Sequence, residues 1–337
     1  MTLHPAVLAL LVASLLTGCM VLYAGWYGAR ILLQWEIGSG SERQLELERR
    51  TYLISTLLSV AFAVQILSLF LFVFTADRLH GMFSGAMCAA GTLNVNGFGY
   101  PVLILKIVTF LLAGLWLVVN HADTRGYDYP LIKWKYALLL AIGPLVLAEG
   151  YLQYRYFAGL HPDVITSCCG SLFGHGQKGI GGDLAALPAG PMEVAFFGGM
   201  AATIACGIRF HGAGRGGYLF SAASSITFAV AVASMISFIC LYIYELPTHH
   251  CPFCILQKEY GYVGYVLYIA LFGGGVAGMG AGVLMPFRGR GSMARVIPAL
   301  QRRLTEVTLV LYLLFTLVVS YRILLSPLRL GGGPTPG

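Results

Sequence analysis

The stretch PVLILKIVTFLLAGLWLVVN occupies residues 101–120 and contains a single charged side chain, Lys106. An α-helix needs about 20 mostly apolar residues to cross the hydrocarbon core of a membrane, so this stretch predicts a membrane-spanning helix. Seven further apolar runs occupy residues 6–33, 52–76, 135–158, 192–209, 218–244, 260–286 and 306–326. We therefore expect an all-α, polytopic membrane helix bundle with eight transmembrane helices.

The composition agrees with a membrane protein. Of the 337 residues, 58% are hydrophobic and 10% are charged, and the mean hydropathy is +0.78. A soluble domain carries about 25% charged residues, so the composition excludes a soluble enzyme. The net charge of +7 is spread over the connections between apolar runs, whereas a nucleic-acid binder gathers its charge in one face or tail. We expect membrane lipid as a partner and no nucleic acid.

The distribution of lysine and arginine predicts the orientation in the membrane. The connections after the first, third, fifth and seventh runs contain 14 of the 21 basic residues, and the opposite side contains six. Lysine and arginine concentrate on the cytoplasmic side, so both termini should face outward. In a bacterium, this predicts an inner-membrane protein whose second, fourth and sixth connections face the periplasm.

Five of the eight cysteines lie in the three connections that the charge count places on the outer side. These five are Cys88, Cys168, Cys169, Cys251 and Cys254. Disulfides persist outside the cytosol, so this clustering favours a shared redox site on that side. The other three cysteines lie within apolar runs, where a cysteine usually behaves as a small hydrophobic residue.

The adjacent residues Cys168 and Cys169 lie in the longest connection, residues 159–191. Adjacent cysteines can close a strained disulfide, and strained disulfides exchange readily. The pair can therefore act as a redox relay, bind a soft metal, or be without a chemical role, either as a static structural disulfide or with no role at all. Cys88 is either the cysteine that resolves a disulfide of this pair or a buried small residue.

The strongest signal for chemistry is LPTHHCPFCILQKEYGYVGY at residues 246–265. Two cysteines separated by two residues can form a reducible disulfide, and the amides at a helix start lower the pKa of a thiol. We expect Cys251 and Cys254 at the beginning of the seventh helix, with Pro252 in its first turn. Lys258 would then lie on the same helical face as Cys254. There it would stabilise a thiolate or an anionic electron acceptor.

At these residues the sequence resembles DsbB and its relatives in the vitamin K epoxide reductase superfamily of membrane proteins. Their pattern is Cys-x-x-Cys, two further residues, Gln or Glu, and Arg at the top of a descending span. CPFCILQK at residues 251–258 reproduces this order, with Lys258 in place of arginine. Lysine keeps the charge but loses the planar fork of arginine. The resemblance covers about residues 218–280.

The resemblance implies a membrane thiol-disulfide oxidoreductase that uses a quinone, either ubiquinone or menaquinone. It makes Cys254 the thiolate facing the quinone, Cys251 the exchanging sulfur, and Lys258 the cation on the quinone side. Gln257 and His250 are further candidates for contact with the quinone. A thioredoxin-like protein on the outer face would be the thiol partner.

The second cysteine pair of the DsbB family lies in a later outer loop and has no collinear counterpart in this chain. If the protein passes electrons through a second site, Cys168, Cys169 or Cys88 must supply it from upstream. We divide the sequence into three regions. Residues 1–217 form a five-span region with outer cysteine loops, residues 218–326 form a DsbB-like hairpin with the last span, and residues 327–337 form a tail.

Two other functional classes stay open besides the oxidoreductase. One is a membrane protein that binds or transports a soft metal through outer cysteine and histidine ligands. The other is a non-catalytic subunit of a membrane complex. The sequence shows no metal-cage spacing, haem-attachment motif or nucleotide-binding loop. We therefore predict no bound metal and no tightly bound cofactor other than quinone.

The sequence allows more than one interpretation of several ionisable residues. Charged groups inside a membrane are costly and call for an explanation. Lys106 can extend its ammonium group to the interface or pair with Glu149, and Glu149 can instead carry protons to a reduced quinone. His249 and His250 are solvated loop residues, groups that promote thiolate formation or relay protons, or ligands of a metal.

Small residues at every fourth position predict flat helix faces against which a neighbouring helix packs closely. One such face in the seventh run consists of Gly274, Gly278 and Gly282. A similar face in the fifth run consists of Gly198, Ala202 and Cys206.

Overall fold

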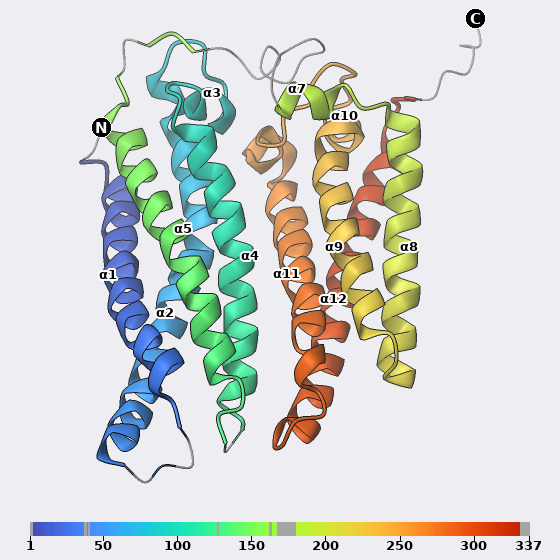
Figure 1. Ribbon diagram of the computed structural model, residues 1–337. Helices are drawn as coiled ribbons and strands as arrows, with labels where there is room; N and C mark the ends of the chain where they lie inside the picture. The colour runs from blue at the N-terminus through green and yellow to red at the C-terminus, as the bar shows by residue number, and fades with distance from the viewer. Residues whose placement is uncertain are drawn as a thin grey trace, which may run out of the picture. The chain divides into compact units, whose positions relative to one another are not determined.

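The computed structural model describes residues 3–36, 39, 41–126, 128–161, 164–166 and 180–330. Within these residues the chain is helical without a β-strand, and eight helices are long and apolar enough to cross a membrane (Figure 1). This confirms the predicted all-α polytopic bundle. The long helices are α1 (Pro5–Gln34), α2 (Glu42–Leu79), α4 (Gly99–Asp123), α5 (Ile132–Ala158), α8 (Ala189–Ala213), α9 (Gly217–Ser234), α11 (Val263–Val283) and α12 (Met293–Leu325).

The sixth span continues beyond α9 through a π-helical turn and one more α-helical turn. Short helices also occupy several connections. These shorter elements are η1 (His80–Met82), α3 (Ala89–Leu93), α7 (Ile180–Ala185), η2 (Met235–Ile239), α10 (Cys240–Tyr244), η3 (Cys254–Leu256), η4 (Lys258–Tyr260) and η5 (Met285–Phe287).

By their internal contacts, the residues form two compact units. Unit 1 comprises Met1–Thr75, Leu93–Pro162 and Val283–Gln301. Unit 2 comprises Ala76–Thr92, Asp163–Gly282 and Arg302–Gly337. The two units are defined by packing. The sequence regions are defined by the motif resemblance, at residues 1–217, 218–326 and 327–337. The two divisions therefore describe different properties of the chain.

The core of unit 1 is formed by the apolar faces of α1, α2, α4 and α5. Its centre holds two fully buried aromatic rings, Phe62 of α2 and Trp116 of α4, in edge-to-face contact with centroids 5.0 Å apart. The Trp116 indole N–H donates to the backbone oxygen of Lys135, 3.1 Å away. We call Phe62 and Trp116 the aromatic layer of unit 1.

Two buried ion pairs flank this aromatic layer along α4 and α5. Lys106 Nζ lies 2.7 Å from Glu149 Oε1, and Lys135 Nζ lies 2.7 Å from Asp123 Oδ2. All four side chains are at most 1% exposed. Of the two alternatives for Lys106, the structure therefore selects pairing with Glu149 over extension to the interface.

Polar side chains of α2 and α4 complete the hydrogen bonding of these charges. Gln65 and Thr109 both donate to Glu149 Oε2, and Lys106 Nζ also donates to Ser68 Oγ at 3.0 Å. A buried charge is tolerated when it is paired and hydrogen-bonded in this way. Lys135 lies within the first turn of α5, which begins at Ile132.

Unit 2 packs α9 and α12 closely against the glycine face of α11. A Cβ atom on Gly278 would overlap Ser224 of α9, and one on Gly274 would overlap the ring of Tyr312 on α12. This confirms the packing face predicted for the seventh run. The face predicted for the fifth run is wrong at Gly198, because a Cβ atom there would meet no described atom within 4 Å. The neighbouring Gly199 faces α9 instead.

Candidate functional site

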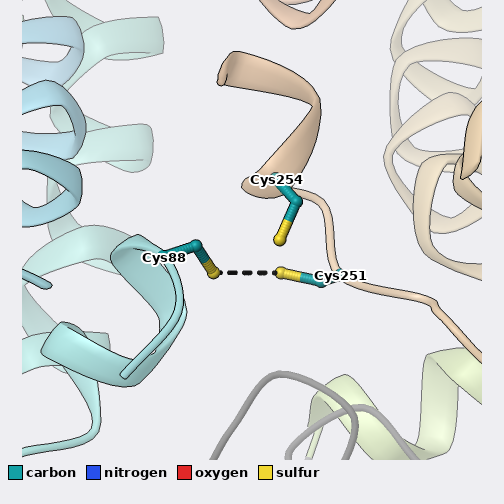
Figure 2. Close-up of side chains that lie close together, drawn as sticks. All are labelled: Cys88, Cys251 and Cys254. Carbon is teal, nitrogen blue, oxygen red and sulfur yellow. Dashed lines mark hydrogen bonds between the residues drawn. The ribbon is translucent and has the colours of Figure 1, made fainter. Parts of the chain in front are cut away.

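Three cysteines of unit 2 form a buried cluster (Figure 2). Their Sγ atoms all lie within 4.8 Å of one another, and the Sγ atoms of Cys88 and Cys251 are 3.6 Å apart. Cys88 and Cys251 are fully buried, and Cys254 is 6% exposed. Cys88 directly precedes α3, Cys251 lies in the loop after α10, and Cys254 begins η3. The sequence predicts the Cys251 and Cys254 pair, and the structure adds Cys88 to it.

The prediction that the pair lies at the start of the seventh helix is wrong. The helix α11 begins only at Val263, nine residues beyond Cys254. The reason is the backbone at Gly261 and Tyr262, which have φ angles of 64° and 56°. A right-handed helix cannot continue through such left-handed residues. Cys254 instead begins a single 3₁₀ turn, so the amides of α11 do not act on its thiol.

The predicted alignment of Lys258 with Cys254 on one helical face is also wrong. Gln257 lies between them in an extended conformation, with φ −83° and ψ 161°, so η3 ends before Lys258 begins η4. The Lys258 side chain is exposed. It therefore does not lie where a helical spacing of four residues would place it.

Gln257 connects the two segments that carry the cysteines. Its Nε2 atom donates to Asp77 Oδ1 and to the backbone oxygen of Met87, both at 3.1 Å. The same Asp77 oxygen accepts from the backbone N–H of Ala89 at 3.2 Å. Ala89 follows Cys88 in the chain, so Asp77 fixes the Cys88 segment to the Cys251–Gln257 segment.

Asp77 is a residue that the sequence reasoning missed. It is one of the few acidic residues at the end of an apolar run, and that position is the only signal it gives. Its partner Gln257 lies 180 residues further along the chain, a distance at which no local pattern connects the two.

Two tyrosines hold the backbone of the cysteine loop. The Tyr244 hydroxyl at the end of α10 donates to the backbone oxygen of Cys251, and the Tyr268 hydroxyl on α11 donates to that of Pro252, both at 2.5 Å. Buried carbonyl groups outside regular helices need such partners, because an unpaired one costs free energy. These bonds fix the loop between the two cysteines from both sides.

His250 is held by the π-helical turn of the sixth span. In that turn the Cys240 N–H bonds to Met235, one residue further back than in an α-helix, which leaves the Ile236 carbonyl available. His250 Nδ1 lies 2.8 Å from this oxygen. A carbonyl can only accept, so Nδ1 carries the proton. His250 is 5% exposed, so its interpretation as a solvated loop residue is wrong.

His249 is half-buried and packs edge-on against the ring of Tyr244, with centroids 4.4 Å apart. Burial lowers the pKa of His249 below its ordinary value, because the charged imidazolium loses solvation. The ring is therefore neutral near pH 7. A neutral imidazole can accept a proton from a thiol.

The Cys88 segment is anchored to the fourth connection. The backbone N–H of Thr166 donates to Ser84, and its hydroxyl donates to the backbone oxygen of Gly91, at 3.0 and 2.8 Å. Gly85 has a φ angle of 86°, and a Cβ atom there would overlap the Thr166 carbonyl oxygen. Only glycine adopts this φ angle without strain and leaves room for the Thr166 carbonyl oxygen, so this turn requires Gly85.

Cys168 and Cys169 lie outside the described residues. Their three alternative interpretations, as a relay, as metal ligands or as residues without a chemical role, therefore stay predictions.

The three residues predicted to contact a quinone have different surroundings. Gln257 and His250 are engaged in holding the cysteine loop, and Lys258 is exposed. Contact of these three residues with a quinone stays a prediction.

The thiol cluster itself is suited to two kinds of chemistry. A disulfide bond is about 2.0 Å long, so Cys88 and Cys251 need to approach by less than 2 Å to exchange. Three thiolates around one metal ion at about 2.3 Å would have sulfur atoms about 4 Å apart. The separation of 3.6 Å between Cys88 and Cys251, and the upper limit of 4.8 Å for all three pairs, are compatible with this value.

The chain matches no protein-family model, no curated protein and no solved structure.

Proposed function

We propose that the chain is a membrane thiol-disulfide oxidoreductase that exchanges electrons between thiols or disulfides on the outer face and a membrane quinone. The observation that carries the proposal is the 3.6 Å separation between the Sγ atoms of Cys88 and Cys251, with Cys254 in the same cluster. A CxxC pair alone can form a disulfide. A third thiol at this distance gives that disulfide a partner for exchange.

The internal step is a transfer of the disulfide within the cluster. The Cys88 thiolate attacks Cys251 Sγ in the Cys251–Cys254 disulfide, the Cys88–Cys251 bond forms, and Cys254 leaves as a thiolate. No electron leaves the chain in this step. The neutral ring of His249 belongs to the same loop and can accept the proton of a thiol.

The complete reaction needs an external donor and an acceptor. Oxidation of two outer thiols to a disulfide releases two electrons and two protons, and reduction of a quinone to a hydroquinone takes up the same number. The DsbB resemblance supplies the quinone as acceptor and a thioredoxin-like protein as the thiol partner. Cys168 and Cys169 would connect this partner to Cys88.

A trapping experiment tests the internal step. Removal of Cys254 leaves Cys88 and Cys251 as the only close pair in the cluster. We expect the Cys254→Ser variant, after mild oxidation with diamide, to accumulate a Cys88–Cys251 disulfide that peptide mass spectrometry detects. The Cys88→Ser variant should instead contain a Cys251–Cys254 disulfide.

A turnover experiment tests the complete reaction. The purified protein should reduce a soluble ubiquinone or menaquinone analogue when a reduced thioredoxin-like protein supplies thiols, and Cys254→Ser should abolish this activity. Cys206→Ser is the matched control, because Cys206 lies on α8 outside the cluster. The absence of turnover with both quinones, together with no Cys88–Cys251 disulfide in the trapping experiment, would overturn the proposal.

A soft-metal site is the second candidate function, and the mutual approach of three buried sulfur atoms within 4.8 Å favours it. Cysteine thiolates select Cu(I) or Zn²⁺ over harder cations. We expect the reduced protein to bind one equivalent of Cu(I) if this candidate is right. Each single cysteine-to-serine change in the cluster should weaken the binding, and Cys206→Ser should not.

A further inference from the structure

A cavity of about 270 Å³ lies in unit 1 between the end of α1 and the beginning of α2. Arg43, Glu46 and Arg50 line it from α2, and they are spaced by three and four residues, so they share one helical face. Arg30 lines it from α1. Arg49 is not part of the lining, although it directly precedes Arg50.

The charged side chains make this cavity electropositive. Three guanidinium groups face one carboxylate, and that carboxylate is engaged, because Glu46 Oε1 lies 2.6 Å from Arg50 Nη2. Arg50 Nη1 also donates to the hydroxyl of Tyr27. The two contacts fix the orientation of the Arg50 guanidinium, so less conformational entropy is lost when it binds an anion.

Exposed aromatic side chains near the cavity are typical of the level of lipid headgroups. Tryptophan and tyrosine concentrate where the hydrocarbon core meets the polar surface. Trp26 is 63% exposed, and the Arg30 guanidinium carbon lies 5.1 Å from the centre of its ring. On α2, Tyr52 is 71% exposed and follows closely after the last lining residue. The lysine and arginine count predicts that this connection is cytoplasmic, where anionic lipids concentrate.

We propose that this cavity binds a phosphate group, with the three arginines as its ligands. The planar fork of a guanidinium donates two parallel hydrogen bonds to phosphate oxygens, which makes arginine suited to this anion. The phosphate belongs either to the headgroup of an anionic phospholipid or to a free phosphate compound. The site lies in unit 1 and does not depend on the thiol chemistry of unit 2.

Native mass spectrometry of the full-length protein in a neutral detergent tests the proposal and distinguishes the two sources. The probes are phosphatidylglycerol, phosphatidylcholine and inorganic phosphate, each added separately. We expect the wild-type protein to retain phosphatidylglycerol at least about fivefold more than phosphatidylcholine. If the source is a free phosphate compound, inorganic phosphate should bind and neither lipid should be preferred.

The decisive variant is Arg30→Gln combined with Arg43→Gln. Both side chains are exposed, so their replacement should leave the fold intact, which an unchanged melting temperature would verify. The double variant should lose the bound phosphate probe at least about fivefold, whereas the control Arg49→Gln should retain it. Equal retention by the double variant and the control, or no preference for any anionic probe, would overturn the proposal.

Discussion

Asp77 joins two distant segments through a single carboxylate oxygen. That oxygen accepts from the Gln257 side chain and from the backbone N–H of Ala89, next to Cys88. The residue does not contact a sulfur atom through either of these bonds, so we interpret it as a positioning residue. Its effect on chemistry should therefore appear in the rate at which Cys88 meets Cys251.

Replacement of Asp77 by alanine should slow disulfide formation between Cys88 and Cys251 about tenfold in the Cys254→Ser background. The two lost hydrogen bonds to a charged group are together worth about 1.5 kcal/mol or more. The rate is measured by quenching oxidation at intervals and quantifying the crosslinked peptide. Asp77→Asn keeps the accepting oxygen and should retain most of the rate. Glu245→Ala, an exposed carboxylate of the same unit, is the control.

Lys106 and Glu149 allow a second prediction at this scale. Removal of one partner leaves the other charge buried and unpaired, which costs about 3–5 kcal/mol. We expect Lys106→Met to lower the melting temperature of the detergent-solubilised protein strongly. The double variant Lys106→Met with Glu149→Gln should recover much of the loss. If Lys106→Met destabilised the protein only because methionine packs poorly, the double variant would not recover the melting temperature.

The order of charges along α4 and α5 specifies how these two helices pair. In chain order α4 carries Lys106 and then Asp123, and α5 carries Lys135 and then Glu149. An antiparallel pairing places each lysine beside a carboxylate, as observed. A parallel pairing would place like charges together. The order of the buried charges therefore agrees with the antiparallel pairing of α4 and α5.

Helix packing in unit 2 depends on the absence of a side chain at Gly278. A Cβ atom at this position would overlap Ser224 on α9. We expect Gly278→Val to reduce the yield of folded protein and to lower its melting temperature. Gly198→Ala is the matched control, because a Cβ atom there has open space and the substitution reduces the conformational freedom of the unfolded chain. An equal loss in both variants would contradict this account of α11.

The elements differ in how far the sequence predicts them. The eight spans follow from hydropathy, which is a local property, and all eight are present. The start of α11 does not follow from hydropathy. It is set by the left-handed backbone of Gly261 and Tyr262, and tyrosine does not predict that conformation. The approach of Cys88 to Cys251 links residues 163 positions apart, which only tertiary packing determines.

At the scale of the whole molecule, the orientation in the membrane is open to a direct test. Lysine and arginine are concentrated in the odd-numbered connections, so we expect the C-terminus and the cysteine loops on the outer side. Alkaline phosphatase fused after residue 330 should be active in a bacterial host, because the enzyme folds only outside the cytosol. A fusion after residue 290 should be inactive. The reverse result would place the cysteine cluster in the reducing cytosol and weaken the redox proposal.

The aromatic layer of unit 1 has an electrical consequence. Protons cross a membrane along connected chains of hydrogen-bonding groups, and Phe62 has none to offer. The one such group of Trp116, its indole N–H, is already engaged with the backbone of Lys135. We therefore expect the layer to interrupt proton transfer between the two ion pairs of unit 1, even though four charges lie inside the unit.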